Sequence, residues 1–284
     1  MKILVTGVGG QLGYDICRVL YARNLEYCGV DIEDFDITDP LATSKFITQY
    51  TPDAIIHCSC YTAVDRAEEE QELCNRVNVT GTENIARAAL SVGAKMMYIS
   101  TDYVFAGEGE NFHRPEDPVS PLSVYGMSKW QGEERVRNTL SEHFIVRISW
   151  MFGKNGNNFV KTMLRLAESK TDLNVVCDQI GSPTYSYDLA HLLCDMIVTE
   201  KYGTYHATNE GICSWAELAA ETMRLSGKQM QIHPIPAAEY PSRAKRPSNS
   251  RLSKDKLTEA GFARLPDWKD ALARYLEELK ETKV

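Results

Sequence analysis

The sequence has little of what marks a secreted, membrane-bound or nucleic-acid-binding protein. Its eight cysteines in 284 residues fall short of the density of a disulfide-stapled scaffold, and no apolar run is long enough to cross a bilayer. Acidic residues outnumber basic ones by 39 to 31, and the net charge of −8 argues against nucleic acid or an anionic membrane as the main partner. The amino terminus shows no apolar segment followed by a cleavage site, so we expect a cytoplasmic protein.

The first 150 residues alternate short apolar runs with longer segments of helical spacing. The apolar runs predict buried strands at 2–6, 27–30, 54–58, 95–100 and 144–149. The segments between them place apolar residues three and four apart, which is typical of amphipathic helices. Strands that alternate with such helices form right-handed crossovers and a parallel sheet covered on both faces. The sequence therefore predicts an α/β fold with a Rossmann-like, doubly wound parallel sheet.

The pattern loosens after about residue 150. We expect helices within 157–170, 186–200 and 214–227, strands within 172–179 and 203–208, a proline-rich basic loop at 233–252 and a closing helix at 268–282. Ser214 and Glu217 have the spacing of a helix capping box. We assign 1–150 to a dinucleotide-binding domain and 151–284 mainly to a smaller α/β substrate-binding lobe. A strand and a helix from about 173–199 are expected to return to the first sheet.

A glycine-rich loop joins the first predicted strand to the first helix. In "VTGVGGQLG", Gly7, Gly10 and Gly13 stand three residues apart, which permits a tight turn, close approach of a pyrophosphate and close packing of helix on strand. The free amides at the helix N-terminus then bind phosphate. Because the loop opens the first strand–helix unit of an alternating chain, we predict a dinucleotide site. We expect Gln11 and Leu12 to border the coenzyme.

The acidic residue expected about twenty positions later is Asp31, at the end of the second strand. A carboxylate there accepts from the ribose 2′-hydroxyl and repels a 2′-phosphate, and no basic residue follows nearby, so the pattern favours NADH over NADPH. Asp31, Glu33, Asp34 and Asp36 are four acids within six residues, which is equally typical of a solvated turn. Both interpretations stay open. Asp36 and Ile37 are expected beside the same coenzyme.

A hydroxyl, a phenol and an ammonium group follow the fourth strand in an order that suits carbonyl reduction. Thr101 stands at the strand's carboxyl end, where ligands of doubly wound sheets bind. Tyr125 and Lys129 open the next helix, and a spacing of four places them on one face. Reduction of a ketone by hydride needs a proton at the developing alkoxide, and a nearby ammonium group lowers the pKa of a tyrosine. Without the glycine loop a surface pair is the better interpretation; with it, a catalytic triad is favoured.

The segment "HCSC" contains His57, Cys58 and Cys60. A zinc site would need a second pair of ligands at defined spacing, and the sequence shows none. Buried reduced thiols are the better interpretation, so we predict no metal at this position.

The motifs "TGVGGQLG", "ISTDYVFAG" and "YGMSKWQGE" together resemble those of an extended short-chain dehydrogenase/reductase. More specifically, five blocks resemble the dTDP-4-dehydrorhamnose reductase family, and they lie at 58–70, 99–105, 147–167, 176–184 and 243–252. These blocks span nearly the whole chain in the family's order. The resemblance is therefore much more specific than a tyrosine and a lysine four residues apart.

The resemblance implies reduction of the C4 ketone of dTDP-4-dehydro-L-rhamnose by NADPH or NADH. It implies that Tyr125 donates the proton, that Lys129 holds the nicotinamide ribose and tunes Tyr125, and that Thr101 binds the C4 oxygen. The other implied contacts are to the coenzyme from Thr62, Ala63 and Val64, to the sugar from Asp102, Tyr103 and Trp150, and to the nucleotide diphosphate from Asn157, Asn158, Arg246 and Arg251.

One departure concerns a metal. Some members of this family dimerise around a magnesium ion held by glutamates of the first helix and the second lobe. The corresponding positions here are Asp15 and Tyr187, so the carboxylate set is incomplete. We therefore predict no metal, and a homodimer, if formed, without such an ion.

Two rival functions share the fold. A non-catalytic regulatory subunit, like that of methionine adenosyltransferase, would bind a dinucleotide and still retain Thr101, Tyr125 and Lys129. A nucleotide-sugar epimerase would also keep the coenzyme site. The sequence "RPSNSRL" and Trp150 favour a working sugar pocket over the first of these.

Overall fold

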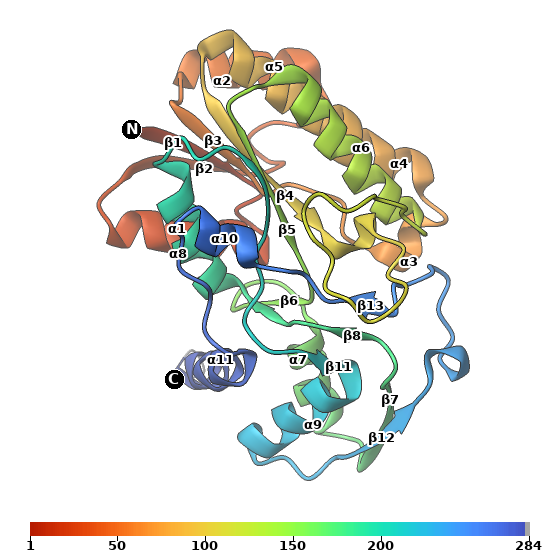
Figure 1. The fold of residues 1–284 in the computed structure, drawn as a ribbon. Helices are drawn as coiled ribbons and strands as arrows, with labels where there is room; N and C mark the ends of the chain where they lie inside the picture. Colours follow the sequence, from red (N-terminus) through yellow and green to blue (C-terminus); the bar gives the residue numbers. More distant parts are fainter. Residues whose placement is uncertain (282–284) are drawn as a thin grey trace.

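A six-stranded parallel sheet forms the larger lobe of the chain, whose residues 1–281 are described by the computed structural model (Figure 1). From one edge to the other, its strands are β2 (Glu26–Val30), β1 (Lys2–Thr6), β3 (Ala54–His57), β4 (Lys95–Thr101), β5 (His143–Ile148) and β10 (Gly203–His206). All of these pairings are parallel. The predicted Rossmann-like doubly wound sheet is thereby confirmed.

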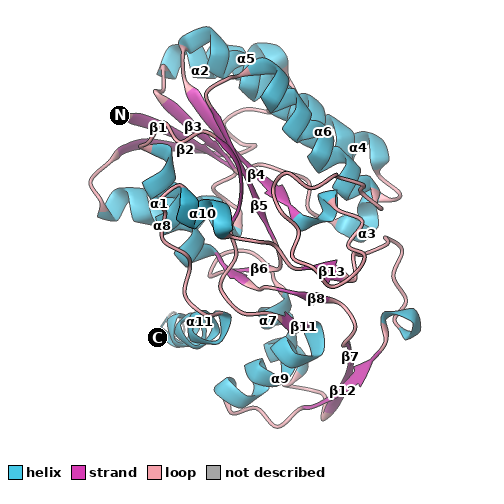
Figure 2. Ribbon diagram, in the orientation of Figure 1, coloured by secondary structure: helices cyan, strands magenta, loops and turns pink. Residues whose placement is uncertain are grey.

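Helices cover both faces of this sheet (Figure 2). On one face lie α1 (Gln11–Ala22) and α8 (Ser186–Ile197), and on the other lie α2 (Pro40–Tyr50), α5 (Thr82–Val92) and α6 (Val124–Thr139). In α1, for example, Leu12, Ile16, Val19 and Leu20 are buried, a spacing that forms one apolar stripe against the sheet. The two faces thus hold two separate apolar layers.

A strand and a helix of the second half of the chain were expected to join the larger sheet. The helix does so as expected, but the strand is a different one. The helix is α8, which packs against α1. The strand is β10, whereas β7 (Asp172–Val176) pairs with β12 (Gln231–Ile235) in the smaller lobe. The sequence of a five-residue strand such as β7 carries no information about its partner, so the expected place of β7 was wrong.

The smaller lobe is built from short strand pairs and three longer helices. Its strands are β6 (Met151–Phe152) with β9 (Thr184–Tyr185), β7 with β12, and β8 (Ile180–Gly181) between β11 (Cys213–Ser214) and β13 (Asn249–Ser250). Its helices are α7 (Phe159–Leu166), α9 (Trp215–Ser226) and α11 (Trp268–Glu281). The predicted capping box of Ser214 and Glu217 is present at the start of α9. The expected last residue of the closing helix, Thr282, lies outside the described residues.

Short elements complete the chain: α3 (Val64–Ala67), α4 (Gln71–Asn75), the π-helix η1 (Arg76–Gly81), the 3-10 turns η2 (Asp102–Val104) and η3 (Ala237–Glu239), and α10 (Asp255–Glu259). The order of the strands reverses between β1 and β3, and in open parallel sheets a ligand binds at such a point, beyond the carboxyl ends of the strands. Within residues 1–281, none of the helices has the length and apolarity needed to span a bilayer.

Candidate active site

A cavity of about 1150 Å³ lies along the carboxyl ends of β1, β2, β3, β4 and β5 and extends to the smaller lobe. It is lined by most of the residues expected around the coenzyme and the substrate: Gly7, Gly10, Gln11, Leu12, Gly13, Asp31, Asp36, Ile37, Thr62, Val64, Thr101, Asp102, Tyr103, Tyr125, Lys129, Trp150 and Asn157. Its size suits a dinucleotide and part of a second ligand. The strand order and the sequence motifs thus lead to the same place.

The glycine loop has the geometry of a phosphate cradle. Gly7 has a φ of 73°, and a Cβ on it would lie 2.6 Å from the Ser59 amide nitrogen. A Cβ on Gly13 would lie 2.3 Å from the Gly7 carbonyl oxygen, so the helix can approach the loop only with glycine there. Gly10 caps α1 without a side chain, and the first turn of α1 carries no acid. These residues fit a dinucleotide, because the amides of the first turn of α1 and the helix dipole face the cavity.

Asp31 contacts the glycine loop itself. Its Oδ2 accepts from the Gly9 amide at 2.6 Å, and its Oδ1 accepts from the Ile32 amide at 2.8 Å. The carboxylate therefore bridges the end of β2 and the loop after β1 while lining the cavity. This position suits the predicted ribose contact, and it adds a structural task that the sequence did not indicate.

Thr101 ends β4 at the cavity, and its hydroxyl is already hydrogen-bonded. The hydroxyl donates to Asp102 Oδ1 at 2.9 Å and accepts from the Tyr103 amide at 3.2 Å. Burial raises the pKa of Asp102 to about 6, against the opposing effect of hydrogen bonds with Ser250 and Thr101. A carboxyl group that keeps its proton to this pH can act as donor or acceptor toward a sugar hydroxyl.

Tyr125 and Lys129 both line the cavity from α6, and the tuning of Tyr125 by Lys129 stays a prediction. Burial raises the pKa of Tyr125 well above its usual value, the charges of Cys60 and Asp102 add to this, and a hydrogen bond with Thr101 opposes it. Lys129 Nζ instead lies 4.1 Å from the centroid of the Tyr98 ring.

Burial would lower the pKa of Lys129, but the phenol of Tyr98 and the thiol of Cys60 more than offset it, and the pKa is raised. Lys129 is therefore a cation although its exposed fraction is 2%. A buried, permanently charged group at the cavity wall is suited to hold hydroxyl oxygens of a ligand.

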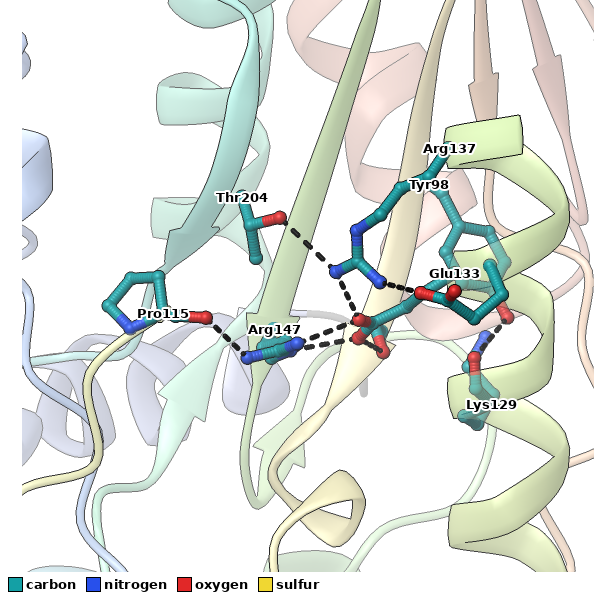
Figure 3. A network of polar contacts seen from close by, with 9 residues as sticks. Tyr98, Pro115, Lys129, Glu133, Arg137, Arg147 and Thr204 are labelled. Carbon is teal, nitrogen blue, oxygen red and sulfur yellow. Dashed lines mark hydrogen bonds and ion pairs between the residues drawn. The ribbon is translucent and has the colours of Figure 1, made fainter. Parts of the chain in front are cut away.

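The helix that carries Tyr125 and Lys129 is fixed to the sheet by a buried ionic network (Figure 3). Glu133, one turn after Lys129 on α6, accepts from Arg147 of β5 through Nε and Nη2, both at 2.8 Å. It also accepts from Ser100 Oγ of β4 at 2.5 Å and from Arg137 at 2.7 Å. This network was not predicted, because a glutamate on a charged helix is typical of a solvated face.

Arg147 reaches further, to the loop that follows β4. Its Nη1 donates to the Pro115 carbonyl at 3.1 Å, and its guanidinium lies 5.0 Å from the Phe105 ring centroid. Arg137 donates to Thr204 of the edge strand β10 at 3.3 Å (Figure 3). The network thus joins β4, β5, β10 and α6 just behind the site.

A second missed residue is Asn78, in the π-helix η1. Its side chain pairs with the backbone of Tyr61, accepting at 2.7 Å and donating at 3.1 Å, and it donates to Ser128 Oγ at 2.9 Å. Ser128 directly precedes Lys129 on α6. Asn78 therefore links the loop after β3 to α6, a contact between distant segments that sequence spacing cannot reveal.

Aromatic side chains form the wall on the side of the smaller lobe. Trp150 has a φ of 49°, unusual for a residue other than glycine, and its ring stacks on Trp215 with centroids 3.8 Å apart. A Cβ on Gly181 would lie 2.9 Å from the Trp150 ring, so the ring is confined from that side too. Trp150 was predicted to border the sugar; Trp215, at the start of α9, was missed.

Four predicted residues do not line the cavity: Ala63, Asn158, Arg246 and Arg251. Asn158 caps α7, and its amide donates to Gln11, Gly153 and Tyr275. Arg251 donates to Asn249 Oδ1 at 3.0 Å, and Arg246 pairs with Asp65. Their roles toward a substrate stay predictions.

The thiols of Cys58 and Cys60 are partly exposed at the cavity wall, so the prediction of buried side chains was wrong for them. The reason is that β3 ends at His57 and the chain turns there along the cavity. Burial of the sulfur still raises the pKa of Cys58 well above its usual value, which keeps the thiol protonated.

Residues 1–281 contain no group of three or more His, Cys, Asp and Glu side chains placed to hold a metal ion. The buried Asp15 accepts from Ser186 Oγ at 2.5 Å and from Arg18 at 2.6 Å, and the Arg18 guanidinium lies 4.7 Å from the Tyr187 ring centroid. The Asp15 carboxylate in α1 is therefore already paired with a cation of the protein itself, the guanidinium of Arg18. These residues do not fit a magnesium site.

Together, a parallel sheet with a glycine loop at its switch point and a tyrosine and lysine four residues apart facing the same cavity define the class. The chain is a short-chain dehydrogenase/reductase.

Comparisons with known proteins agree with this class. Residues 1–281 match the family described as "RmlD substrate binding domain". The spore coat polysaccharide biosynthesis protein SpsK of Bacillus subtilis is 41% identical over 98% of this chain and 97% of its own. A dTDP-4-dehydrorhamnose reductase of Clostridium acetobutylicum has a crystal structure with a TM-score of 0.96 and 42% identity, covering 99% and 100% of the two chains.

A second solved structure is that of dTDP-4-dehydrorhamnose reductase from Bacillus anthracis in complex with NADP. It has a TM-score of 0.95 and 39% identity, and the match covers 98% of this chain and 99% of that one. The chain belongs to the RmlD family.

Proposed function

We propose that this protein reduces the C4 ketone of dTDP-4-dehydro-L-rhamnose to dTDP-L-rhamnose with NADPH or NADH. The observation that carries the proposal is that Thr101, Tyr125 and Lys129 face one cavity with the glycine loop. The family supports the substrate, since solved relatives at 42% and 39% identity are named dTDP-4-dehydrorhamnose reductases. The non-catalytic subunit and the epimerase are not favoured.

The coenzyme, when bound, supplies the hydride. On the side of the protein, Tyr125 gives its phenolic proton to the alkoxide that develops at C4, so that the ketone becomes a hydroxyl group. Thr101 turns its hydroxyl from Asp102 to the C4 oxygen and stabilises the developing charge. Lys129 holds the nicotinamide ribose, for which its permanent charge is suited.

Binding of the rest of the substrate is proposed as follows. Asp102, Tyr103 and Trp150 border the sugar from the cavity wall, where Trp150 contributes apolar surface beside the deoxy position. The diphosphate meets the Asn157–Asn158 turn and the arginines 246 and 251, whose planar forks suit phosphate oxygens.

The NADP complex of the Bacillus anthracis relative supports NADPH as a coenzyme, while Asp31 at the cavity favours NADH. We propose that the protein acts in the cytoplasm, because all eight of its cysteines are free thiols and thiols stay reduced in that compartment. The net charge of −8 supports small-molecule partners over nucleic acid or membranes. A homodimer stays a prediction.

The test is the loss of absorbance at 340 nm with purified protein, dTDP-4-dehydro-L-rhamnose, and NADPH or NADH in parallel. We expect one coenzyme to be oxidised for each sugar reduced, with dTDP-L-rhamnose identified by mass and chromatography. If neither coenzyme is consumed while both bind, the protein is a dinucleotide-binding partner and the proposal fails.

A further inference from the structure

A strap from the smaller lobe crosses to the larger lobe beside the cavity. We define the strap as residues 240–246, between η3 and β13 (Figure 1). Both of its ends are fixed: the Ala237 amide donates to Asp178 at 2.8 Å, and the Ser248 hydroxyl donates to the Gly107 carbonyl at 2.8 Å. Between these anchors, the polar side chains of the strap meet α3 of the larger lobe.

Asp65, in the first turn of α3, is the residue on which the strap converges. Its Oδ2 accepts from Arg246 Nη2 at 2.6 Å, and its Oδ1 accepts from Arg246 Nη1 and the Ala244 amide, both at 3.1 Å. The Ser242 hydroxyl donates to the same oxygen at 3.3 Å. The hydrogen bonds from Arg246 lower the pKa of Asp65 to about 2, so the carboxylate is charged at any physiological pH.

This convergence contributes little to stability. The exposed fraction of the Asp65 side chain is 44% and that of Arg246 is 25%, and solvent-exposed ion pairs have small effects on folding. A carboxylate that binds three residues of one loop at the surface instead restricts where that loop can lie. Its position in the chain is informative too, because α3 begins at Val64, which lines the cavity together with Thr62.

On its inner side, Arg246 reaches the wall of the cavity. Its guanidinium lies near Tyr103, which lines the cavity, and its charge opposes the rise in the Tyr103 pKa that burial causes. The Tyr103 ring in turn meets the Tyr125 ring edge to face, with centroids 5.5 Å apart. Asp65, Arg246, Tyr103 and Tyr125 thus form a continuous row from the surface to the proton donor.

We propose that Asp65 is a positioning residue that fixes Arg246, and with it the strap, where the guanidinium meets the diphosphate of the nucleotide sugar. This inference rests on the proposed function, which supplies the diphosphate. An arginine held on one side by a carboxylate loses less conformational freedom when a phosphate binds on the other side. Asp65 therefore acts on substrate affinity and leaves the chemical step and coenzyme binding to the ligand-free enzyme nearly unchanged.

The test compares Asp65→Asn with Glu69→Gln, a matched control that removes the partner of Arg243 in the same strap. For Asp65→Asn we expect the KM of the 4-dehydro sugar and the Kd of dTDP by calorimetry to rise about tenfold, roughly one lost charged hydrogen bond. The kcat, the Kd of NADPH measured without dTDP and the thermal midpoint should stay within about twofold and 2 °C of wild type. Glu69→Gln should resemble wild type, and Asp65→Glu should recover part of the affinity.

A double-variant comparison separates positioning from a general effect. If Asp65 acts through Arg246, Asp65→Asn should weaken dTDP binding in the wild type but not in an Arg246→Ala background. An unchanged dTDP affinity in Asp65→Asn overturns the inference, and a tighter one overturns it by showing that Asp65 competes with the phosphate. If the wild type binds dTDP but does not reduce the sugar, the proposed function fails while the role of Asp65 is still decided by calorimetry. If the wild type does not bind dTDP, both fail.

Discussion

In the proposed reaction, Tyr125 at the cavity wall supplies the proton that completes the reduction. We predict that Tyr125→Phe lowers kcat by about 100- to 10,000-fold, the usual contribution of one general acid. NADPH affinity, followed by fluorescence titration, should change little because the ring remains. Tyr61→Phe is the control, since that phenol donates to Glu70 and takes no part in the proposed chemistry. Turnover that survives in Tyr125→Phe would remove Tyr125 from the mechanism.

Asp31 is the single residue expected to set the preference between NADH and NADPH. Asp31→Asn removes the charge that repels a 2′-phosphate but keeps an oxygen that can accept from the Gly9 amide. We predict that the ratio of kcat/KM for NADPH to that for NADH rises roughly fivefold to tenfold, because the electrostatic penalty is lost. The ratio is measured at two salt concentrations, since screening should shrink the wild-type preference as well. A ratio that does not move would limit Asp31 to its contact with the loop.

At the scale of elements, α6 depends on its buried ionic anchor. We predict that Glu133→Gln destabilises the fold by about 3 kcal/mol or more, because it leaves the fully buried guanidinium of Arg147 without its countercharge. The neighbouring Glu134→Gln is the control: Glu134 is 42% exposed and pairs with Arg137, so its loss should cost at most about 0.5 kcal/mol. Urea unfolding of the three proteins measures both effects, and equal stabilities would contradict the role given to the anchor.

The same anchor predicts a pH dependence. Burial alone would raise the pKa of Glu133, but the ion pairs with Arg147 and Arg137 outweigh it and lower the pKa below the usual 4.5. A lowered folded-state pKa gives stability that is present above the unfolded value and is lost as pH falls through the folded one. The stability difference between wild type and Glu133→Gln should therefore be constant above about pH 5 and shrink below about pH 4.5. A difference that grows on acidification would refute the assigned direction.

The elements differ in how far sequence could predict them. Strands such as β1 and β4 were predicted within one residue, because a buried parallel strand is a continuous apolar run between turn signals. The partner of β7 and the place of β10 were not, because pairing depends on contacts between segments far apart in the chain. The Glu133–Arg147 pair and the contact of the strap with Asp65 could not be predicted for the same reason. Their charged residues are visible in the sequence, but a charged residue by itself indicates a solvated surface and not a particular partner.

At the scale of the whole molecule, Asp65 lies between the expected coenzyme site and the strap that is proposed to bind the substrate diphosphate. Asp65 directly follows Val64 and stands three residues after Thr62, and both of these line the cavity where the coenzyme is expected. Its carboxylate also accepts a hydrogen bond from Arg246 of the strap. A coenzyme that orders this wall should therefore also order the strap, and the coupling must be reciprocal. We predict that saturating NADP⁺ lowers the Kd of dTDP about fivefold, and that dTDP lowers the Kd of NADP⁺ by the same factor. Calorimetry measures both, and Asp65→Asn should abolish the coupling while each ligand still binds alone. Equal dTDP affinities with and without NADP⁺ in the wild type would mean that the two lobes bind their ligands independently.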